Sequence, residues 1–107
     1  MPALPTSPAR ERIRSTVPKL AELADEVVYG EVWERPGLSK RDRSLITVAA
    51  LVALGREAQL EGHVARALAN GVTRDEISEL ITHLAFYSGW PTAMTAATVA
   101  KEVFEKG

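Results

Sequence analysis

The stretch Arg41–His63, RDRSLITVAALVALGREAQLEGH, decides the fold that this sequence predicts. It opens with two arginines one residue apart, continues through an apolar segment from Leu45 to Leu54, and ends at one of the two histidines of the protein. β-branched residues in the apolar segment would also fit a strand, but its length and its alanines and leucines favour a helix. Gly55 breaks the pattern, so we expect a helix, a tight break and a second helix that carries His63 inward. A helix that is apolar on nearly every side is normally buried on every side.

Further helix signals lie on both sides of this stretch. Pro18 suits the first turn of a helix that runs to about Tyr29, and Ser39 is a good N-cap for the central helix. The run from Thr73 to Glu76 is a capping box for a later helix, and Pro91 opens the last one. The sequence therefore predicts an all-α fold of about five helices with short connections.

The length of 107 residues indicates one domain. We expect residues 1–16, which contain three prolines within the first eight positions, to form an N-terminal arm that is mobile or straps a partner. Residues 17–107 would form the helical domain. The central helix and the alanine-rich last helix offer more apolar surface than one small core needs, so we expect a homo-oligomer.

The amino-acid composition excludes or disfavours several classes of function and of binding partner. The chain has no cysteine, which excludes disulfides, thiolate zinc sites and thiol chemistry by its own residues. A formal net charge of -1 gives no reason to expect nucleic acid or a membrane surface as partner. No targeting or membrane-spanning segment is recognisable, so we expect a soluble, cytoplasmic protein.

Candidate chemistry centres on His63 and the two arginines. His63 lies on the apolar stripe of its helix, where it is either a core histidine bonded to a backbone carbonyl or a general acid–base group in a pocket. Arg41 and Arg43 point in different directions, so one suits a substrate carboxylate and the other a structural or intersubunit ion pair. Two solvated charges are the alternative, although cations at a helix N-terminus cost stability.

Two further groups of residues are weaker candidates. His83 and Tyr87 continue a row that starts at Glu79 on one helix face, which is either a solvated face or an interface or pocket wall. Glu31 and Trp33 precede the central helix, where they form either a pocket rim or an ordinary helix end.

Other chemistries find little support. Two histidines 20 residues apart without thiolates do not make a metal site, so we expect no metal. No glycine-rich phosphate loop or nucleophile elbow is present. The helix-turn-helix pattern of residues 67–88 suggests DNA, but acidic residues outnumber Arg74 on the reading helix, which disfavours phosphate contact.

The run from Val32 to Ala96 resembles the carboxymuconolactone decarboxylase family, within the alkylhydroperoxidase D-like superfamily. The likeness extends over about residues 30–104 and is closest to the 4-carboxymuconolactone decarboxylase branch. The motifs that carry it are Trp33, Arg35–Leu38, Arg41–Leu45, His63, Asn70–Thr73, Glu76–Ile77, Glu79, His83, Tyr87 and Gly89–Pro91. A thiol-dependent branch of the superfamily has a CxxC pair where this chain has Arg56 and Gln59, so the resemblance does not extend to peroxidase activity.

The resemblance implies a fold, an assembly and an activity. The fold is an alkylhydroperoxidase D-like helical domain, assembled as a homohexamer or trimer of dimers with pockets where subunits meet. The activity is cofactor-independent decarboxylation, by a carboxy-lyase, of a carboxylated lactone from aromatic-compound catabolism, in the β-ketoadipate pathway. The alternative is a non-redox ligand-binding or accessory oligomer of the same family.

The resemblance also suggests roles for the candidate residues. His63, Arg41 and Glu31 would be catalytic, with His63 supplying a proton and an arginine holding the anion. Four further residues would bind the substrate: Arg43, Trp33, His83 and Tyr87.

Overall fold

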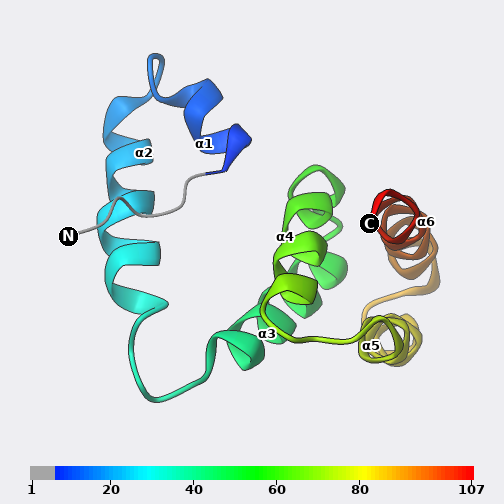
Figure 1. The fold of residues 1–107 in the computed structure, drawn as a ribbon. Helices are drawn as coiled ribbons and strands as arrows, with labels where there is room; N and C mark the ends of the chain where they lie inside the picture. The colour runs from blue at the N-terminus through cyan, green and yellow to red at the C-terminus, as the bar shows by residue number, and fades with distance from the viewer. Residues whose placement is uncertain (1–6) are drawn as a thin grey trace. The chain divides into compact units, whose positions relative to one another are not determined.

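A computed structural model describes residues 7–107, which form six α-helices and one π-helix and contain no β-strand (Figure 1). The predicted all-α class is confirmed. The described residues pack as two compact units, residues 7–38 and Ser39–Gly107. None of their helices is long and apolar enough to cross a membrane.

The first unit contains α1 (Pro8–Ile13), α2 (Pro18–Leu23) and the π-helix η1 (Ala24–Val32). The helix predicted from Pro18 begins there, but the chain continues as a helix beyond Tyr29 and through Gly30. The widened turns are closed by bonds such as that from the Trp33 N–H to the Val28 carbonyl, five residues back, at 2.9 Å. Residues 1–6 of the predicted arm lie outside the described residues, and its boundary at residue 16 stays a prediction.

The second unit contains α3 (Lys40–Leu54), α4 (Glu57–Ala69), α5 (Arg74–Tyr87) and α6 (Trp90–Lys106). The Ser39 hydroxyl caps α3 by accepting the Asp42 N–H at 3.0 Å, as the sequence predicted. Gly55 ends α3 with φ of 70°, a left-handed conformation that favours glycine, and the chain turns back into α4. The predicted helical hairpin over Arg41–His63 is therefore confirmed.

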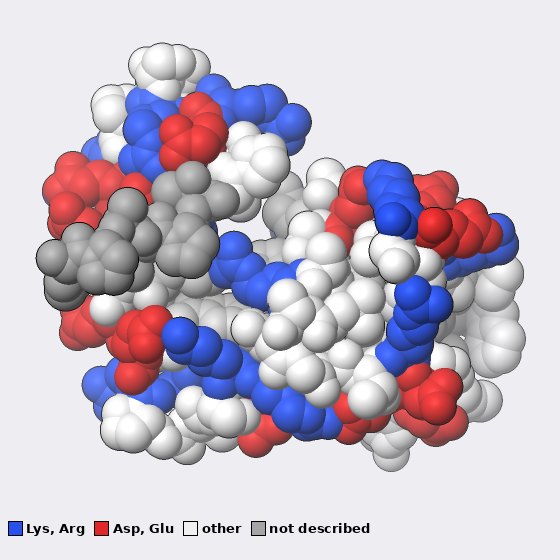
Figure 2. All heavy atoms as spheres, viewed as in Figure 1, with Lys and Arg blue, Asp and Glu red and all other residues white. Residues whose placement is uncertain are grey.

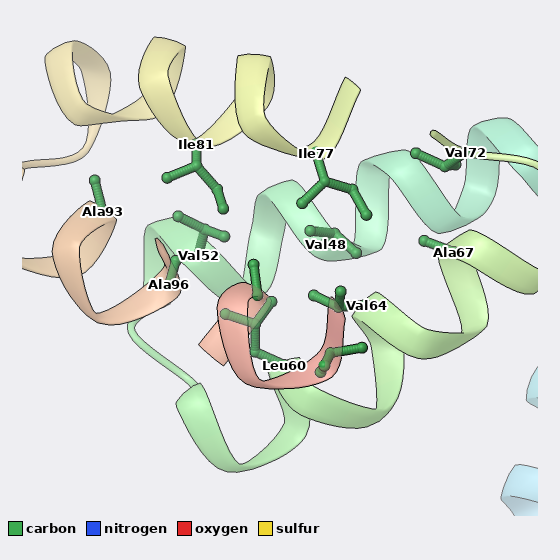
Figure 3. Packing of buried hydrophobic residues seen from close by; sticks show 12 residues of the cluster. Val48, Val52, Leu60, Val64, Ala67, Val72, Ile77, Ile81, Ala93 and Ala96 are labelled. Carbon is green, nitrogen blue, oxygen red and sulfur yellow. The ribbon is translucent and has the colours of Figure 1, made fainter. Parts of the chain in front are cut away.

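The core of the second unit lies where α3 and α4 meet α5 and α6. In Figure 3, Ile77 and Ile81 of α5 point toward Val48 and Val52 of α3. Small residues of α6 line the opposite side and allow close approach of that helix. The remaining buried members are Leu60, Val64, Ala67, Val72, Ala93, Ala96, Ala100 and Val103.

One face of α3 is not covered within the chain. Ile46 is 55% exposed and Leu54 is 66% exposed, whereas Val48 and Val52 are buried. The expectation that α3 is buried on every side is therefore wrong for the single chain, because α4, α5 and α6 all pack on one side of it. Its outer apolar residues remain open to solvent or to a partner.

Candidate functional site

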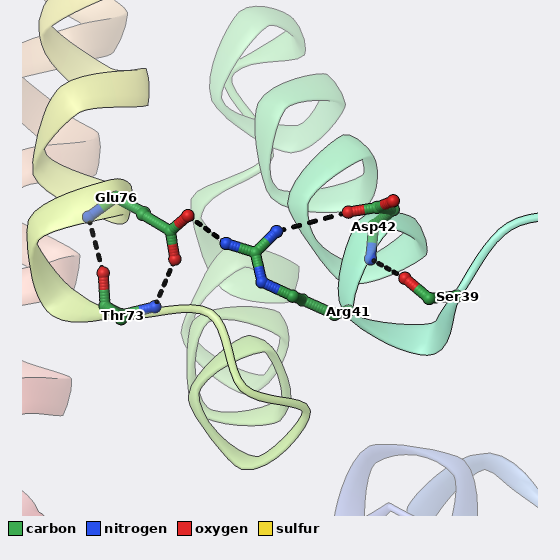
Figure 4. A network of polar contacts seen from close by, with 5 residues as sticks. All are labelled: Ser39, Arg41, Asp42, Thr73 and Glu76. Carbon is green, nitrogen blue, oxygen red and sulfur yellow. Dashed lines mark hydrogen bonds and ion pairs between the residues drawn. The ribbon is translucent and has the colours of Figure 1, made fainter.

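The N-terminal end of α3 is tied to the N-terminal end of α5 through Arg41. The Arg41 guanidinium donates to Glu76 of α5 through Nη2 and to Asp42 through Nη1, the second contact at 3.2 Å (Figure 4). Because the two carboxylates flank the guanidinium, they offset the cost of a cation in the first turn of a helix. A substrate carboxylate would have to displace them.

The same glutamate caps α5. Glu76 Oε1 accepts the Thr73 N–H at 2.9 Å, and the Thr73 hydroxyl accepts the Glu76 N–H at 3.1 Å. This is the capping box that the sequence predicted, with both of its bonds present. The structure adds that Arg41 joins it, so one carboxylate both caps α5 and holds α3 beside it.

Acidification is expected to remove this network. The Thr73 backbone N–H and then the Arg41 guanidinium lower the pKa of Glu76 below the ordinary glutamate value of about 4.3. Because the pKa is lower in the folded state, the stabilisation is fully present above the unfolded-state pKa and is lost as the pH falls through the folded-state pKa. In urea unfolding measured from pH 7 to pH 3, Glu76→Gln should be less stable than wild type at pH 7 and approach it at acidic pH. Parallel losses of stability in the two proteins would contradict this role.

The open end of the α3–α4 hairpin, opposite the turn at Gly55, is fixed by a second polar contact between helices. The Asn70 amide donates to the Ser44 hydroxyl at 2.9 Å, and Ser44 is buried. This contact places the end of α4 level with the start of α3, as expected for antiparallel neighbours. His63 lies two turns earlier on α4, is half-buried, and has its Nδ1 atom shielded from water.

His83 and Tyr87 lie on a different surface. Their rings stack one helical turn apart on α5, with centroids 4.6 Å apart, and both side chains are exposed. Phe86 and Trp90 meet edge to face beside them, with centroids 5.9 Å apart. The row predicted from Glu79 is thus an exposed face opposite the buried Ile77 and Ile81, and its role in binding stays a prediction.

Glu31 and Trp33 belong to the first unit. Glu31 is exposed in η1, and Trp33, which ends η1, is half-buried with its ring 5.5 Å from that of Tyr29. Arg10 packs its guanidinium over Tyr29 at 4.4 Å and contacts Asp25 at 3.2 Å. Their proposed sharing of a site with Arg41 and His63 stays a prediction.

A pocket of about 330 Å³ opens between α5 and α6. None of the predicted site residues lines it, and its largely apolar lining includes Phe104 together with Lys101 and Glu105. Its other lining residues are Ser78, Ile81, Thr82, Ala97 and Ala100. Within residues 7–107, no group of three or more histidine or acidic side chains is arranged to hold a metal ion.

Sequence reasoning missed the contacts of Arg41 with Glu76 and of Asn70 with Ser44. The partners are 35 and 26 residues apart, so no local spacing reveals them. One signal for the first was present: an arginine in the first turn of a helix needs an acidic neighbour to offset the helix dipole.

Comparison with known proteins gives the family. A family model described as "Carboxymuconolactone decarboxylase family" matches residues 18–102. The chain is 51% identical over 77 residues to 4-carboxymuconolactone decarboxylase of Acinetobacter baylyi, an alignment that covers 72% of this chain and 58% of that protein. It is 38% identical over 81 residues to nitrosuccinic acid decarboxylase npaB of Metarhizium robertsii, covering 76% of this chain and 57% of that protein.

A third relative has no assigned activity. The chain is 34% identical over 98 residues to an uncharacterised 15.0 kDa protein from the nqo9–nqo10 intergenic region of Paracoccus denitrificans, covering 90% of this chain and 71% of that protein. The chain thus spans less than two thirds of the length of both decarboxylases. Because the family model matches most of the sequence, including the whole α3–α4 hairpin, the chain belongs to the carboxymuconolactone decarboxylase family.

Proposed function

We propose that this protein is a carboxy-lyase that decarboxylates a carboxylated lactone from aromatic-compound catabolism without a cofactor. The observation that carries the proposal is the 51% identity to a 4-carboxymuconolactone decarboxylase. The second decarboxylase among its relatives supports the reaction class, and the absence of cysteine excludes the thiol chemistry of the related peroxidases.

Decarboxylation requires an electron sink in the substrate and three catalytic tasks from the protein. Both decarboxylase names denote substrates with carboxylates and an electron-withdrawing group, a lactone carbonyl in one and a nitro group in the other. Loss of CO2 leaves an electron pair that moves onto that group. The protein must anchor the remaining anion, stabilise the developing negative charge and deliver a proton to carbon.

Residues of this chain are chemically suited to these catalytic tasks. An arginine anchors a carboxylate through two parallel hydrogen bonds, and the half-buried His63 carries the proton. A hydrogen-bond donor at the developing oxyanion lowers the activation free energy by about 3–4 kcal/mol. Glu31, Trp33, His83 and Tyr87 are the remaining site residues of the proposal.

The exposed apolar side chains support a homo-oligomer. Figure 2 shows a broad uncharged area on the visible face of the second unit, with acidic and basic side chains around it. Large apolar side chains are exposed on α3, α5 and α6, namely Ile46, Leu54, Phe86, Tyr87, Trp90 and Met94. Aromatic residues and methionine are enriched at subunit interfaces, so we assign these exposed side chains to the interfaces of a homohexamer or trimer of dimers in the cytoplasm. A folded monomer in sedimentation velocity at micromolar concentration would contradict the assembly.

The direct test of the activity uses 4-carboxymuconolactone. Purified protein should consume this compound and release one CO2 per molecule, without added metal or cofactor. The absence of turnover at high protein concentration would exclude this substrate. Calorimetric binding without turnover would instead support a ligand-binding oligomer, the second class that the sequence allows.

A further inference from the structure

We infer that the outer face of the α5–α6 hairpin is a two-fold interface, in which Phe86, Trp90 and Met94 of one copy dock into the α5–α6 pocket of a second copy. This interface is one of those of the homo-oligomer in the proposed function, on which the inference rests, and it does not depend on the decarboxylase activity. It gives an occupant to a pocket that none of the predicted site residues lines.

The hollow half of this face is the pocket of about 330 Å³ between α5 and α6. Its lining is largely apolar, and four of the residues that line it are small, namely Ser78, Thr82, Ala97 and Ala100. An apolar cavity of about 150 Å³ accepts a benzene ring, so this pocket has room for an aromatic side chain and a neighbour. It therefore suits bulky apolar groups that enter from outside the chain.

The protruding half of the face lies at the turn between the two helices. Phe86 is 76% exposed, Trp90 is 59% exposed and Met94 is 57% exposed. The rings of Phe86 and Trp90 meet edge to face, with centroids 5.9 Å apart, so the end of α5 and the start of α6 present one aromatic cluster. Large apolar side chains that are exposed together are typical of a surface that a partner covers.

Both halves belong to the same face of the hairpin. Ser78, Thr82 and Phe86 are spaced i, i+4 and i+8 on α5, so they project within about 80° of one another. A stripe on α6 is equally narrow, within about 80°. Its members are Trp90, Met94, Ala97, Lys101 and Glu105. Because α5 and α6 are antiparallel neighbours (Figure 1), the pocket lies toward the open end of this hairpin and the aromatic cluster lies at its turn.

A protrusion and a hollow on one face are self-complementary under a two-fold axis. On α6 the pocket is centred near Lys101 and the protruding side chains near Thr92, about 13 Å apart along the helix. An axis that crosses the hairpin near Ala97, midway between them, turns one copy end for end over the other. The cluster of each copy then lies over the pocket of the other, so the contact is made twice. Ala97 is small, which lets the two α6 helices approach closely at the axis.

The distribution of charge favours a second copy as the occupant. Residues 80–100 contain no Asp, Glu, Lys or Arg, although these types make up 25% of the chain. Among the residues of the two rows, only Lys101 and Glu105 are charged, and they pair with each other. In the two-fold arrangement the Lys101 residues of the two copies are about 12 Å apart along the helices, which exceeds the Debye length at physiological salt. Like charges are therefore not brought together.

The area is sufficient for a specific interface. The three protruding side chains are each more than half exposed and offer about 100–150 Å² each. With the pocket lining included, each copy contributes about 500 Å², and the two copies together bury on the order of 1,000 Å², the lower limit for a specific interface.

Sedimentation velocity of the full chain tests the interface. Phe86→Lys and Met94→Lys each place an ammonium group against the apolar pocket of the partner. Each should therefore raise the dissociation constant of this contact on the order of 100-fold and release a smaller species. Circular dichroism should stay as in wild type, because both residues are exposed in the single chain. Thr95→Lys is the matched control: it adds the same charge next to Met94, at an exposed position about 100° around α6, and should keep the wild-type size.

A cross-link tests the two-fold arrangement. The chain has no cysteine, so Ala97→Cys carries a single thiol, and the axis brings the thiols of two copies together. With copper phenanthroline as oxidant, Ala97→Cys should form a covalent dimer, whereas Thr95→Cys should not.

The outcomes separate this interface from the rest of the proposed function. Phe86→Lys and Met94→Lys proteins of wild-type size, or an oligomer in which Ala97→Cys gives no covalent dimer, would overturn the interface while upholding a homo-oligomer. A wild-type monomer would overturn both, and resistance of the Ala97→Cys thiol to alkylation in that monomer would show that another segment of the same chain fills the pocket. Assembly through this face without turnover of 4-carboxymuconolactone would uphold the interface and contradict the proposed activity.

Discussion

His63→Ala is expected to lower kcat for decarboxylation by about 10²–10⁴-fold, the usual contribution of a positioned acid–base group. In the proposed mechanism this side chain delivers the proton to carbon after CO2 leaves. The half-buried position keeps the imidazole in place and shields its Nδ1 from water. The effect should fall on kcat more than on KM, because proton delivery belongs to the reaction and not to substrate binding.

The measurement compares His63→Ala and His63→Gln with Gly62→Ala. Glutamine keeps hydrogen-bonding capacity without acid–base function, so it should be almost as inactive as alanine. The adjacent Gly62 is exposed, and a Cβ built on it meets no atom within 4 Å, so its alanine variant should keep the wild-type kcat. A His63→Ala protein with unchanged kcat would remove the proposed role, whereas an equal loss in Gly62→Ala would trace the effect to disturbance of α4.

Local signals predicted the elements of the second unit well. The N-cap at Ser39, the break at Gly55 and the capping box from Thr73 are each made by residues within a few positions of one another. The physical cause of each feature is thus contained in a short stretch of sequence. The helix that starts at Pro18 shows the limit, because apolar periodicity does not separate an α-helix from the wider π-helix that follows Leu23.

The candidate site could be predicted only in part, because its geometry depends on contacts between distant residues. The sequence supplied His63 and the choice between Arg41 and Arg43, but no spacing rule shows that Arg41 meets Glu76. Nor does the sequence show that Asn70 meets Ser44, the contact that joins the end of α4 to the start of α3. Periodicity gives the face of each helix, and only the packing of helices gives the neighbour of that face.

Leu60→Ala is expected to destabilise the protein by about 2–5 kcal/mol, against a total stability of about 5–15 kcal/mol for a domain of this kind. Leu60 is 2% exposed and lies in the core among Val64, Val52 and the alanines of α6. Alanine would remove apolar contacts and leave a cavity, because the surrounding core packs from several helices and relaxes only partly around the lost side chain. Urea unfolding followed by circular dichroism should show the loss as a lower midpoint with a similar slope.

Leu54→Ala is the matched control, since it makes the same chemical change at a leucine that is 66% exposed in the single chain. In a monomer it should cost less than about 0.5 kcal/mol, as exposed positions usually do. If a second copy covers the outer face of α3, the Leu54→Ala oligomer should instead dissociate at a higher protein concentration than the wild-type oligomer does. This follows because binding of a partner stabilises the folded state by mass action. Unfolding at two protein concentrations separates the two cases. Equal, concentration-independent losses at Leu54 and Leu60 would contradict both the core described for α4 and the open face described for α3.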